Sequence, residues 1–249
     1  MITYAGRKFL IDPCLADKGT FPPVPSAVNP DRWNPLVDLP VPLEELMAVD
    51  SVVVTHLHFD HFDEMARKLL PKSVSLFARN EVEAEDLRSS GFTHVSSLNG
   101  EGTLVDGILL TRTEGEHGHG EEVARHYAER HICPEVCGVV FYHPGEPVLY
   151  IAGDTVWCTG VQEALDRHQP DVIVLNAGDA RFLTGSSIIM GAEDVCRACR
   201  GAPRATVIAS HMEAVNHAPL TRAELGEFLR RMGVDGQVLI PADGEECTF

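Results

Sequence analysis

The chain has 249 residues, of which 44% are hydrophobic and 23% charged, an ordinary balance for a globular protein with a sizeable core. A formal net charge of −17 and the lack of any Lys/Arg cluster make nucleic acid an unfavourable partner. No apolar run reaches the length of about 18 residues that a membrane span needs, and the N-terminus does not resemble a secretory signal. Seven cysteines, an odd number, indicate free thiols in a reducing compartment. We therefore expect a cytoplasmic protein with a small-molecule partner and no membrane partner, and the sequence leaves homo-oligomer formation open.

The N-terminal half predicts alternating strands and helices. A strand at 8–12 is followed by residues 13–42, whose eight prolines rule out regular structure. Long irregular segments often serve function, so 13–42 is a candidate lid over a site, with plain surface coverage as the alternative. The β-branched run at 51–55 predicts a buried strand. The other elements predicted in this half are strands at 73–78 and 107–113 and helices at 63–70, 81–90 and 121–131.

The C-terminal half continues the pattern. Strands at 137–143 and 147–154 flank a Pro-Gly turn and predict a hairpin. Further strands are predicted at 171–176, 205–210 and 237–241, and helices at 161–169, 192–200 and 221–232. The simplest interpretation is one α/β domain spanning 1–249, with central sheets and outer helices. Several strands end in polar residues at the sheet edge where sites gather in such folds, namely His56, Asp154, Asn176 and, just after Ser210, His211.

The stretch "THLHFDHFD" at residues 55–63 places four metal-binding side chains directly after a buried strand. His56 and His58 face the same way in an extended segment and can share one ion. Asp60 and His61 can turn toward a second ion as the chain enters the next helix. Imidazole with carboxylate suits Zn²⁺, with Mn²⁺, Fe or Co²⁺ as alternatives. A solvated histidine cluster is the competing interpretation, and an apolar strand behind it makes that a poor one.

This HxHxDH spacing resembles the signature of the metallo-β-lactamase superfamily. That resemblance implies a four-layer αββα sandwich with the metals at one sheet edge. The further ligands that the family requires are matched by His117 in "TEGEHGHG", Asp154 in "YIAGDTVW" and His211 in "IASHMEAVNH". The segments "LIDP", "AGDT" and "HMEAVNH" look closest to the ascorbate-6-phosphate-lactonase-like branch. The opening "MITY" is short for the family's first strand, which predicts a clipped first hairpin.

The resemblance also implies a role for each ligand. One metal is expected on His56, His58 and His117, a second on Asp60, His61 and His211, and Asp154 is expected to bridge them. Two such ions, zinc by preference and manganese or iron otherwise, would share a hydroxide that attacks a small ester, lactone or phosphodiester. Asp60 is the candidate to pass a proton to the leaving group. The alternatives are an iron-dependent oxidoreductase, a nuclease or phosphodiesterase, and a non-catalytic metal-binding protein.

Other polar residues near these motifs are candidates for the surroundings of the site. Asp12 is expected to hydrogen-bond a ligand imidazole, or else to form a turn before Pro13. Spacing alone does not exclude His119 in place of His117 as a ligand, and His119 is otherwise expected at the rim of the pocket. The remaining candidates, each with a plain turn or surface role as its alternative, are Thr155, Asn176 and His217.

Overall fold

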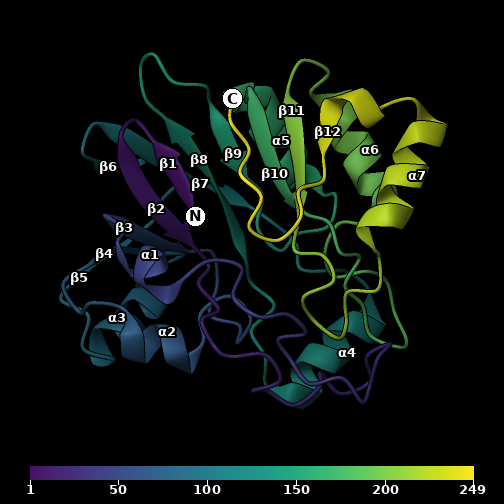
Figure 1. The fold of residues 1–249 in the computed structure, drawn as a ribbon, viewed down its shortest axis with the longest axis horizontal. Coiled ribbons are helices and arrows are strands. Elements are labelled where there is room, and N and C mark those ends of the chain that lie inside the picture. Colours follow the sequence, from purple (N-terminus) through teal and green to yellow (C-terminus); the bar gives the residue numbers. More distant parts are fainter.

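Two β-sheets packed face to face form the centre of the molecule, and helices cover their outer faces (Figure 1). The computed structural model describes residues 1–249. It confirms the predicted αββα sandwich. The two sheets are built from consecutive parts of the chain, because the first sheet holds β1 to β5 and the second holds β6 to β12.

The first sheet has five strands in the order β1-β2-β3-β4-β5. β1 and β2 form an antiparallel hairpin of three residue pairs, and β2 to β5 run parallel. The opening hairpin is therefore present, although its first strand is as short as the sequence predicts. The strands are β1 (Ile2–Tyr4), β2 (Arg7–Ile11), β3 (Ser51–Val54), β4 (Ser75–Ala78) and β5 (His94–Ser97).

The second sheet has seven strands in the order β12-β11-β10-β9-β8-β7-β6. β6 to β9 are antiparallel, which includes the predicted hairpin of β8 and β9, whereas β9 to β12 are parallel. The strands are β6 (Thr103–Val105), β7 (Ile108–Glu114), β8 (Cys137–Tyr142), β9 (Leu149–Ile151), β10 (Val172–Asn176), β11 (Thr206–Ser210) and β12 (Val238–Leu239).

Separate apolar clusters hold the layers together. Phe9 and Val53 of the first sheet meet Phe141 and Ile151 of the second in the cluster between the sheets. A second cluster joins the first sheet to its helices, and a third joins the second sheet to α5, α6 and α7. The helices are α1 (Leu43–Met47), α2 (Glu64–Leu69), α3 (Glu81–Ser89), α4 (Glu121–Arg130), α5 (Thr159–His168), α6 (Ala192–Gly201) and α7 (Arg222–Met232), with a 3-10 turn, η1, at Asp235–Gln237.

The predicted elements are all present, and the elements that the sequence does not predict are small and lie mostly at edges. The strand β5, at the edge of the first sheet, has no apolar run. The strand β6, at the edge of the second sheet, exposes Leu104. α1 is a single short helix at the end of the proline-rich segment. Residues 13–42 contain no helix and no strand beyond isolated bridges, as their prolines predict.

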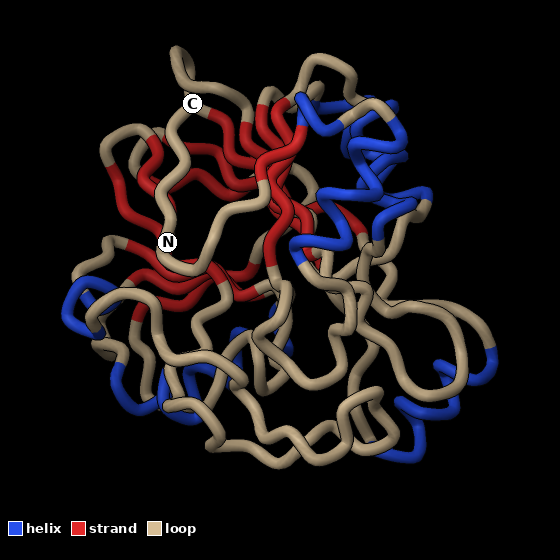
Figure 2. The backbone as a smooth tube through the Cα atoms, turned by 45° about the vertical axis from the view of Figure 1, so that its right-hand side comes forward, coloured by secondary structure: helices blue, strands red, loops and turns tan.

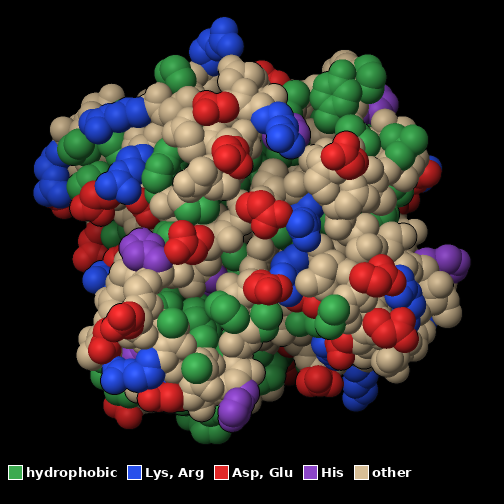
Figure 3. Space-filling model, turned by 180° about the vertical axis from the view of Figure 1, so that it is seen from behind, with side chains coloured by type: hydrophobic (Ala, Val, Ile, Leu, Met, Phe, Trp, Pro, Cys, Tyr) green, Lys and Arg blue, Asp and Glu red, His purple; other side chains and the backbone are tan.

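Loops gather at one end of the molecule, below the strands in Figure 2. This end receives the carboxyl ends of β3, β9, β10 and β11, the place where ligands bind in open α/β sheets. On the face shown in Figure 3, Lys and Arg side chains lie among Asp and Glu side chains and form no continuous basic field. No helix combines the length and apolar character that crossing a bilayer requires.

Candidate metal centre

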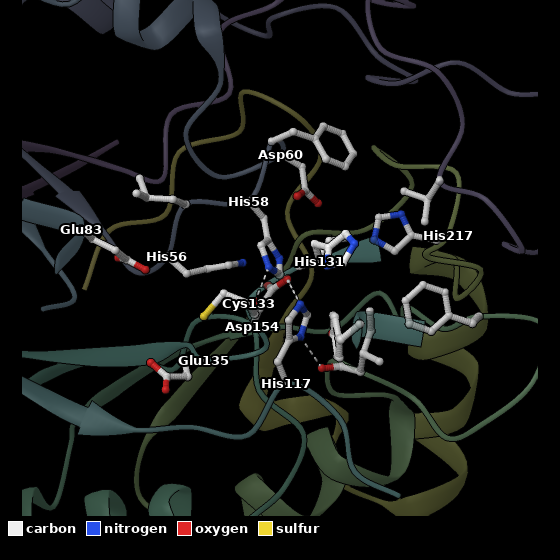
Figure 4. A pocket seen from close by; sticks show the side chains of 17 residues that line it. His56, His58, Asp60, Glu83, His117, His131, Cys133, Glu135, Asp154 and His217 are labelled. Carbon is white, nitrogen blue, oxygen red and sulfur yellow. Dashed lines mark hydrogen bonds and ion pairs between the residues drawn. The ribbon is translucent and has the colours of Figure 1, made fainter. Parts of the chain in front are cut away.

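Seven His and Asp side chains from both sheets converge at this loop-rich end. The "THLHFDHFD" stretch leaves the end of β3, and three further residues follow β7, β9 and β11. The close approach of the two sheets at this end brings together residues far apart in the chain, such as His61 and His211, which are 150 positions apart. Figure 4 shows His56, His58 and His117 pointing toward a common centre, with Asp154 beside them and Asp60 close by.

The first group consists of His56, His58 and His117, whose potential ligand atoms all lie within 4.8 Å of one another. His117 Nδ1 lies 2.8 Å from the Ile188 carbonyl, and His58 Nε2 lies 2.8 Å from the Cys133 carbonyl. Each carbonyl accepts a hydrogen bond from one ring N–H, which leaves the opposite ring nitrogen with a lone pair. Burial lowers the pKa of all three imidazoles, that of His117 to about 4, so they are neutral near pH 7, as metal ligands must be.

The second group consists of Asp60, His61 and His211, again with ligand atoms within 4.8 Å of one another. His61 Nε2 lies 3.2 Å from His211 Nε2, and Asp60 Oδ2 lies 3.7 Å from the same His211 nitrogen. Burial alone would lower the pKa of His61, but the Asp154, Asp12 and Asp60 carboxylates outweigh it and raise this pKa well above its usual value. The same three carboxylates would attract a divalent cation to this position.

Asp154 lies between the two groups. Its Oδ2 is 3.1 Å from His61 Nε2 and 3.8 Å from His117 Nε2, so one carboxylate faces both. Burial would raise the pKa of Asp154, yet His61 and His211 outweigh burial and hold it well below its usual range. Asn176 Nδ2 donates to the other oxygen, Oδ1, at 2.6 Å. The carboxylate is therefore ionised and oriented between the groups.

The donor set fits metal binding by a direct structural criterion. His56 Nε2 is buried and has no hydrogen-bond partner in the protein. Leaving a buried polar atom unpaired costs about 1–3 kcal/mol. The His56 ring lies 4.0 Å from that of His61 and 4.3 Å from that of His58, measured between centroids, so three imidazoles crowd around this nitrogen. An ion bound between these rings would satisfy the unpaired nitrogen.

Two polar side chains hold the ligand loops from behind. Asp12 accepts hydrogen bonds from Thr55 through the backbone N–H at 2.7 Å and the hydroxyl at 2.6 Å, and it contacts His61 Nδ1 at 2.9 Å. Its backbone is left-handed, with φ at 46°, which directs the carboxylate back to the end of β3. Thr155 accepts from the backbone N–H of Glu116 at 2.9 Å and thereby anchors the loop that carries His117.

The structure separates the two histidines of "GEHGHGEE". His117 is 4% exposed and lies in the first group, whereas His119 is exposed and lies outside the cavity lining. The rim position expected for His119 is therefore not found; its backbone carbonyl instead accepts a hydrogen bond from Ser186. Gly118 has φ at +81°, a left-handed turn that sends the two side chains in different directions.

A cavity of about 390 Å³ opens over the two groups (Figure 4). None of its 17 lining residues is Lys or Arg. The charged walls are acidic, from Glu83 and Glu135 beside the cluster, and His217 lines the opposite side (Figure 4). The uncharged walls are largely apolar or aromatic and include Val24, Leu57, Phe59, Tyr127, Phe182 and Ile188.

A buried amide holds one wall of the cavity. Asn216 Oδ1 accepts from the backbone N–H of Val24 at 3.0 Å and from Asn34 Nδ2 at 2.9 Å, while its Nδ2 donates to the Asn29 carbonyl at 3.1 Å. The Asn216 backbone N–H donates to Asn34 Oδ1 at 2.8 Å. These bonds tie the proline-rich segment to the loop that carries His217. Val24 of this segment is part of the wall, and closure of the segment as a lid stays a prediction.

Sequence patterns singled out His217 of the cavity lining but not its apolar and aromatic wall residues. Tyr127 lies on α4 in the predicted helix, one turn after the buried Val123, and only this spacing could have marked it as inward-facing. Phe182 and Ile188 belong to an irregular stretch without periodicity. Their place depends on the packing of α4 against that stretch, shown by the 5.9 Å edge contact of the Tyr127 and Phe182 rings.

Comparisons with known proteins agree with this geometry. Residues 7–212 match the family model described as a beta-lactamase superfamily domain. The UPF0173 protein YddR of Bacillus subtilis (strain 168) is 46% identical over 250 residues, which cover 100% of this chain and 96% of that protein. A UPF0173 metal-dependent hydrolase of Rubrobacter xylanophilus is 25% identical over 99% of this chain and 90% of that protein. The crystal structure of an isothiocyanate hydrolase from Delia radicum gut bacteria superposes with a TM-score of 0.93 at 44% identity, covering 100% of this chain and 95% of that one.

Proposed function

The chain belongs to the UPF0173 metal-dependent hydrolases of the metallo-β-lactamase superfamily, and from this premise we propose that it hydrolyses small, uncharged, apolar electrophiles, with isothiocyanates as the leading class. We further propose that two divalent ions, zinc by preference, are held by the residues of the two groups and by Asp154. Such ions would activate a bound water at neutral pH and polarise the substrate.

The observation that carries the substrate class is the lining of the cavity. A phosphodiester or a phosphorylated lactone brings negative charge, which proteins usually pair with Arg, Lys or a helix N-terminus. The cavity lining contains neither Lys nor Arg, and its Glu83 and Glu135 carboxylates are paired with the buried Arg79, so the wall offers an anion no unpaired guanidinium or ammonium group. The apolar side chains of Val24, Phe59 and Phe182 suit an alkyl or aryl group instead. The lining therefore disfavours the phosphodiester and ascorbate-6-phosphate-lactonase-like alternatives and leaves neutral esters and lactones as second candidates.

An isothiocyanate satisfies these constraints, and the relative with 44% identity is named an isothiocyanate hydrolase. Its central carbon is electrophilic, and the remainder of the molecule is an apolar group of variable size. Addition of water to R–N=C=S gives R–NH–C(=O)–SH, which breaks its C–N bond to release R–NH₂ and carbonyl sulfide. The reaction needs no oxidant or second substrate.

The chain's own residues have separate tasks in this proposal. Asp154, held by Asn176, would orient the reacting water between the two groups. Asp60, which lines the cavity, is placed to pass a proton to the leaving nitrogen. The apolar wall would exclude bulk water and hold the R group away from the ligands.

The test is a panel of matched substrates on the metal-reconstituted protein. Phenethyl isothiocyanate, a phenethyl ester, a phenyl-substituted lactone and a phenethyl phosphodiester present the same apolar group with different reacting centres. We expect the isothiocyanate to be hydrolysed fastest, with equal amounts of amine and carbonyl sulfide, and the phosphodiester slowest. Preferred hydrolysis of the phosphodiester would refute the proposal. Metal analysis of protein purified without added metal tests the oxidoreductase alternative, which a single redox-active iron would favour.

A further inference from the structure

Tyr127 on α4 is a buried phenol beside the metal centre that takes no part in any hydrogen bond of the protein. The residue is 4% exposed and lines the cavity, and its hydroxyl has no partner. The ring lies 5.5 Å from the ring of His117 and 6.4 Å from that of His58, measured between centroids. Phe182 packs against it edge-on, so the ring is held from the other side.

An unpaired buried hydroxyl is unfavourable by about 1–3 kcal/mol. Proteins retain such groups mainly where a water, an ion or a ligand supplies the missing hydrogen-bond partner. The Tyr4 hydroxyl, by contrast, donates to the Pro147 carbonyl at 2.9 Å. The buried Tyr150 hydroxyl also lacks a partner, but Tyr150 lies outside the cavity lining, so Tyr127 is the tyrosine whose unpaired hydroxyl belongs to a residue of the cavity. Two acids of the metal centre act on the Tyr127 phenol. Together with burial, Asp154 and Asp60 raise the pKa of the Tyr127 hydroxyl, so it stays protonated and remains a hydrogen-bond donor.

We propose that Tyr127 is a catalytic residue whose hydroxyl donates a hydrogen bond to the substrate atom that gains negative charge when water adds to the electrophilic carbon. In an isothiocyanate this atom is the sulfur. The inference rests on the proposed function and extends it, because it names the protein group that recognises the reacting end of the substrate. Outside the two groups, the cavity lining also offers N–H or S–H donors on His131, Cys133 and His217, but Tyr127 carries its only hydroxyl.

The chemistry of the step requires a donor of this kind. Addition of water to the central carbon moves one electron pair of the C=S bond onto sulfur. A fixed O–H directed at that position stabilises the charge in the transition state more than in the neutral substrate, which is the condition for raising kcat. The proton of Tyr127 stays on its oxygen throughout, so the phenol needs no base.

The experiment compares Tyr127→Phe with Tyr150→Phe, a fully buried tyrosine of β9 outside the cavity lining. With phenethyl isothiocyanate we expect kcat of Tyr127→Phe to fall about 10²-fold, with KM changed much less and metal content unchanged. The melting temperature of the ligand-free protein should stay the same or rise, because the lost hydroxyl had no partner. Tyr150→Phe should retain the wild-type kcat.

A second readout keeps this inference separate from the choice of substrate. Thiocyanate, a linear N–C–S anion that binds metals, is titrated into the Co²⁺-loaded wild type and Tyr127→Phe while the Co²⁺ absorption spectrum is followed. We expect the variant to bind thiocyanate about tenfold more weakly. If the wild type fails to hydrolyse isothiocyanates, the proposed function is wrong and this titration still decides the role of Tyr127. Equal thiocyanate affinity, or an unchanged kcat in an active enzyme, would overturn the inference, as would a lower melting temperature together with lost metal.

Discussion

The metal cluster and the cavity wall above it are built in opposite ways. Four of the seven cluster residues come from one stretch of six positions after β3, and the other three closely follow strand ends. The wall collects single residues from irregular or helical segments, such as Val24, Tyr127, Phe182 and His217. The cluster is held by Asp12, Thr155 and Asn176, whereas the wall depends on the Asn216 amide and on aromatic packing.

From this difference we infer that the cluster determines the reaction and that the wall determines the substrate. Ligand atoms at strand ends occupy positions set by the sheets, which tolerate little change, so the same cluster can serve many substrates. Loop and helix residues can change without disturbing the sheets, and they decide which R group enters. Damage to the cluster should therefore abolish metal binding, whereas damage to the wall should alter substrate binding with the metals in place.

The largest effect is expected for Asp154→Ala, which removes the carboxylate between the two groups. We expect the variant to lose bound metal and at least about a thousandfold in kcat/KM, because charge stabilisation worth several kcal/mol disappears. Metal analysis and isothiocyanate hydrolysis measure the two losses. Asp166→Ala on α5, whose carboxylate only accepts a hydrogen bond from Gln162, serves as the control. Full metal content in Asp154→Ala would contradict the predicted bridging role.

A smaller effect is expected for Asp12→Asn, which keeps the size of the side chain and tolerates the left-handed backbone. The loss of charge beside His61 should weaken metal affinity about 10–100-fold while the fold is retained. Competition with a chelating dye measures this affinity. The control is Asp50→Asn, which alters an exposed carboxylate far from the metal centre. That carboxylate pairs with Arg7 and accepts a hydrogen bond from the Lys8 backbone N–H. Equal metal affinity of the two variants would show that Asp12 does not strengthen metal binding through His61.

Asn216→Ala tests the wall alone. Removing the amide leaves the Val24 N–H and Asn34 Nδ2 without their acceptor, so we expect unfolding stability to drop by about 1–3 kcal/mol. KM for phenethyl isothiocyanate should rise more than kcat falls, with metal content unchanged. Urea denaturation and steady-state kinetics give these values. Asn99→Ala, which removes an exposed turn amide, is the matched control. Loss of metal from Asn216→Ala would show that wall and cluster are not independent.

The smallest effect is expected for His119→Ala in "GEHGHGEE", where His117→Ala serves as the contrasting variant. His119→Ala should retain metal content and activity, because its side chain is exposed and lies outside the cavity. His117→Ala should lose metal, because its ring belongs to the first group. Metal analysis of the two variants side by side is sufficient. Loss of metal from His119→Ala with full metal content in His117→Ala would identify His119 as the ligand instead of His117.

Local sequence patterns determined much of this protein. The alternating strands and helices predicted one α/β domain, and the resemblance of "THLHFDHFD" to the metallo-β-lactamase superfamily implied the four-layer fold, which is confirmed. The same resemblance, with the His and Asp side chains of the motif, implied the enzyme class, a metal-dependent hydrolase, which the relatives support. These predictions succeed because alternation along a strand and polar residues at its end are local, and the fold turns them into a shared edge. The metal roles of the individual residues, and the number of ions, stay predictions.

The tertiary structure alone decided the remainder. The left-handed turn at Gly118 places His117 in the first group and leaves His119 exposed, and the pairing of Asp12 with His61 joins residues 49 positions apart. The wall residues Val24, Tyr127 and Phe182 share no period or motif, because each reaches the cavity through packing of distant segments. Local sequence specifies which side chains a strand end presents. Only long-range packing decides which of them meet, and so which buried hydroxyl, such as that of Tyr127, is left without a partner in the protein.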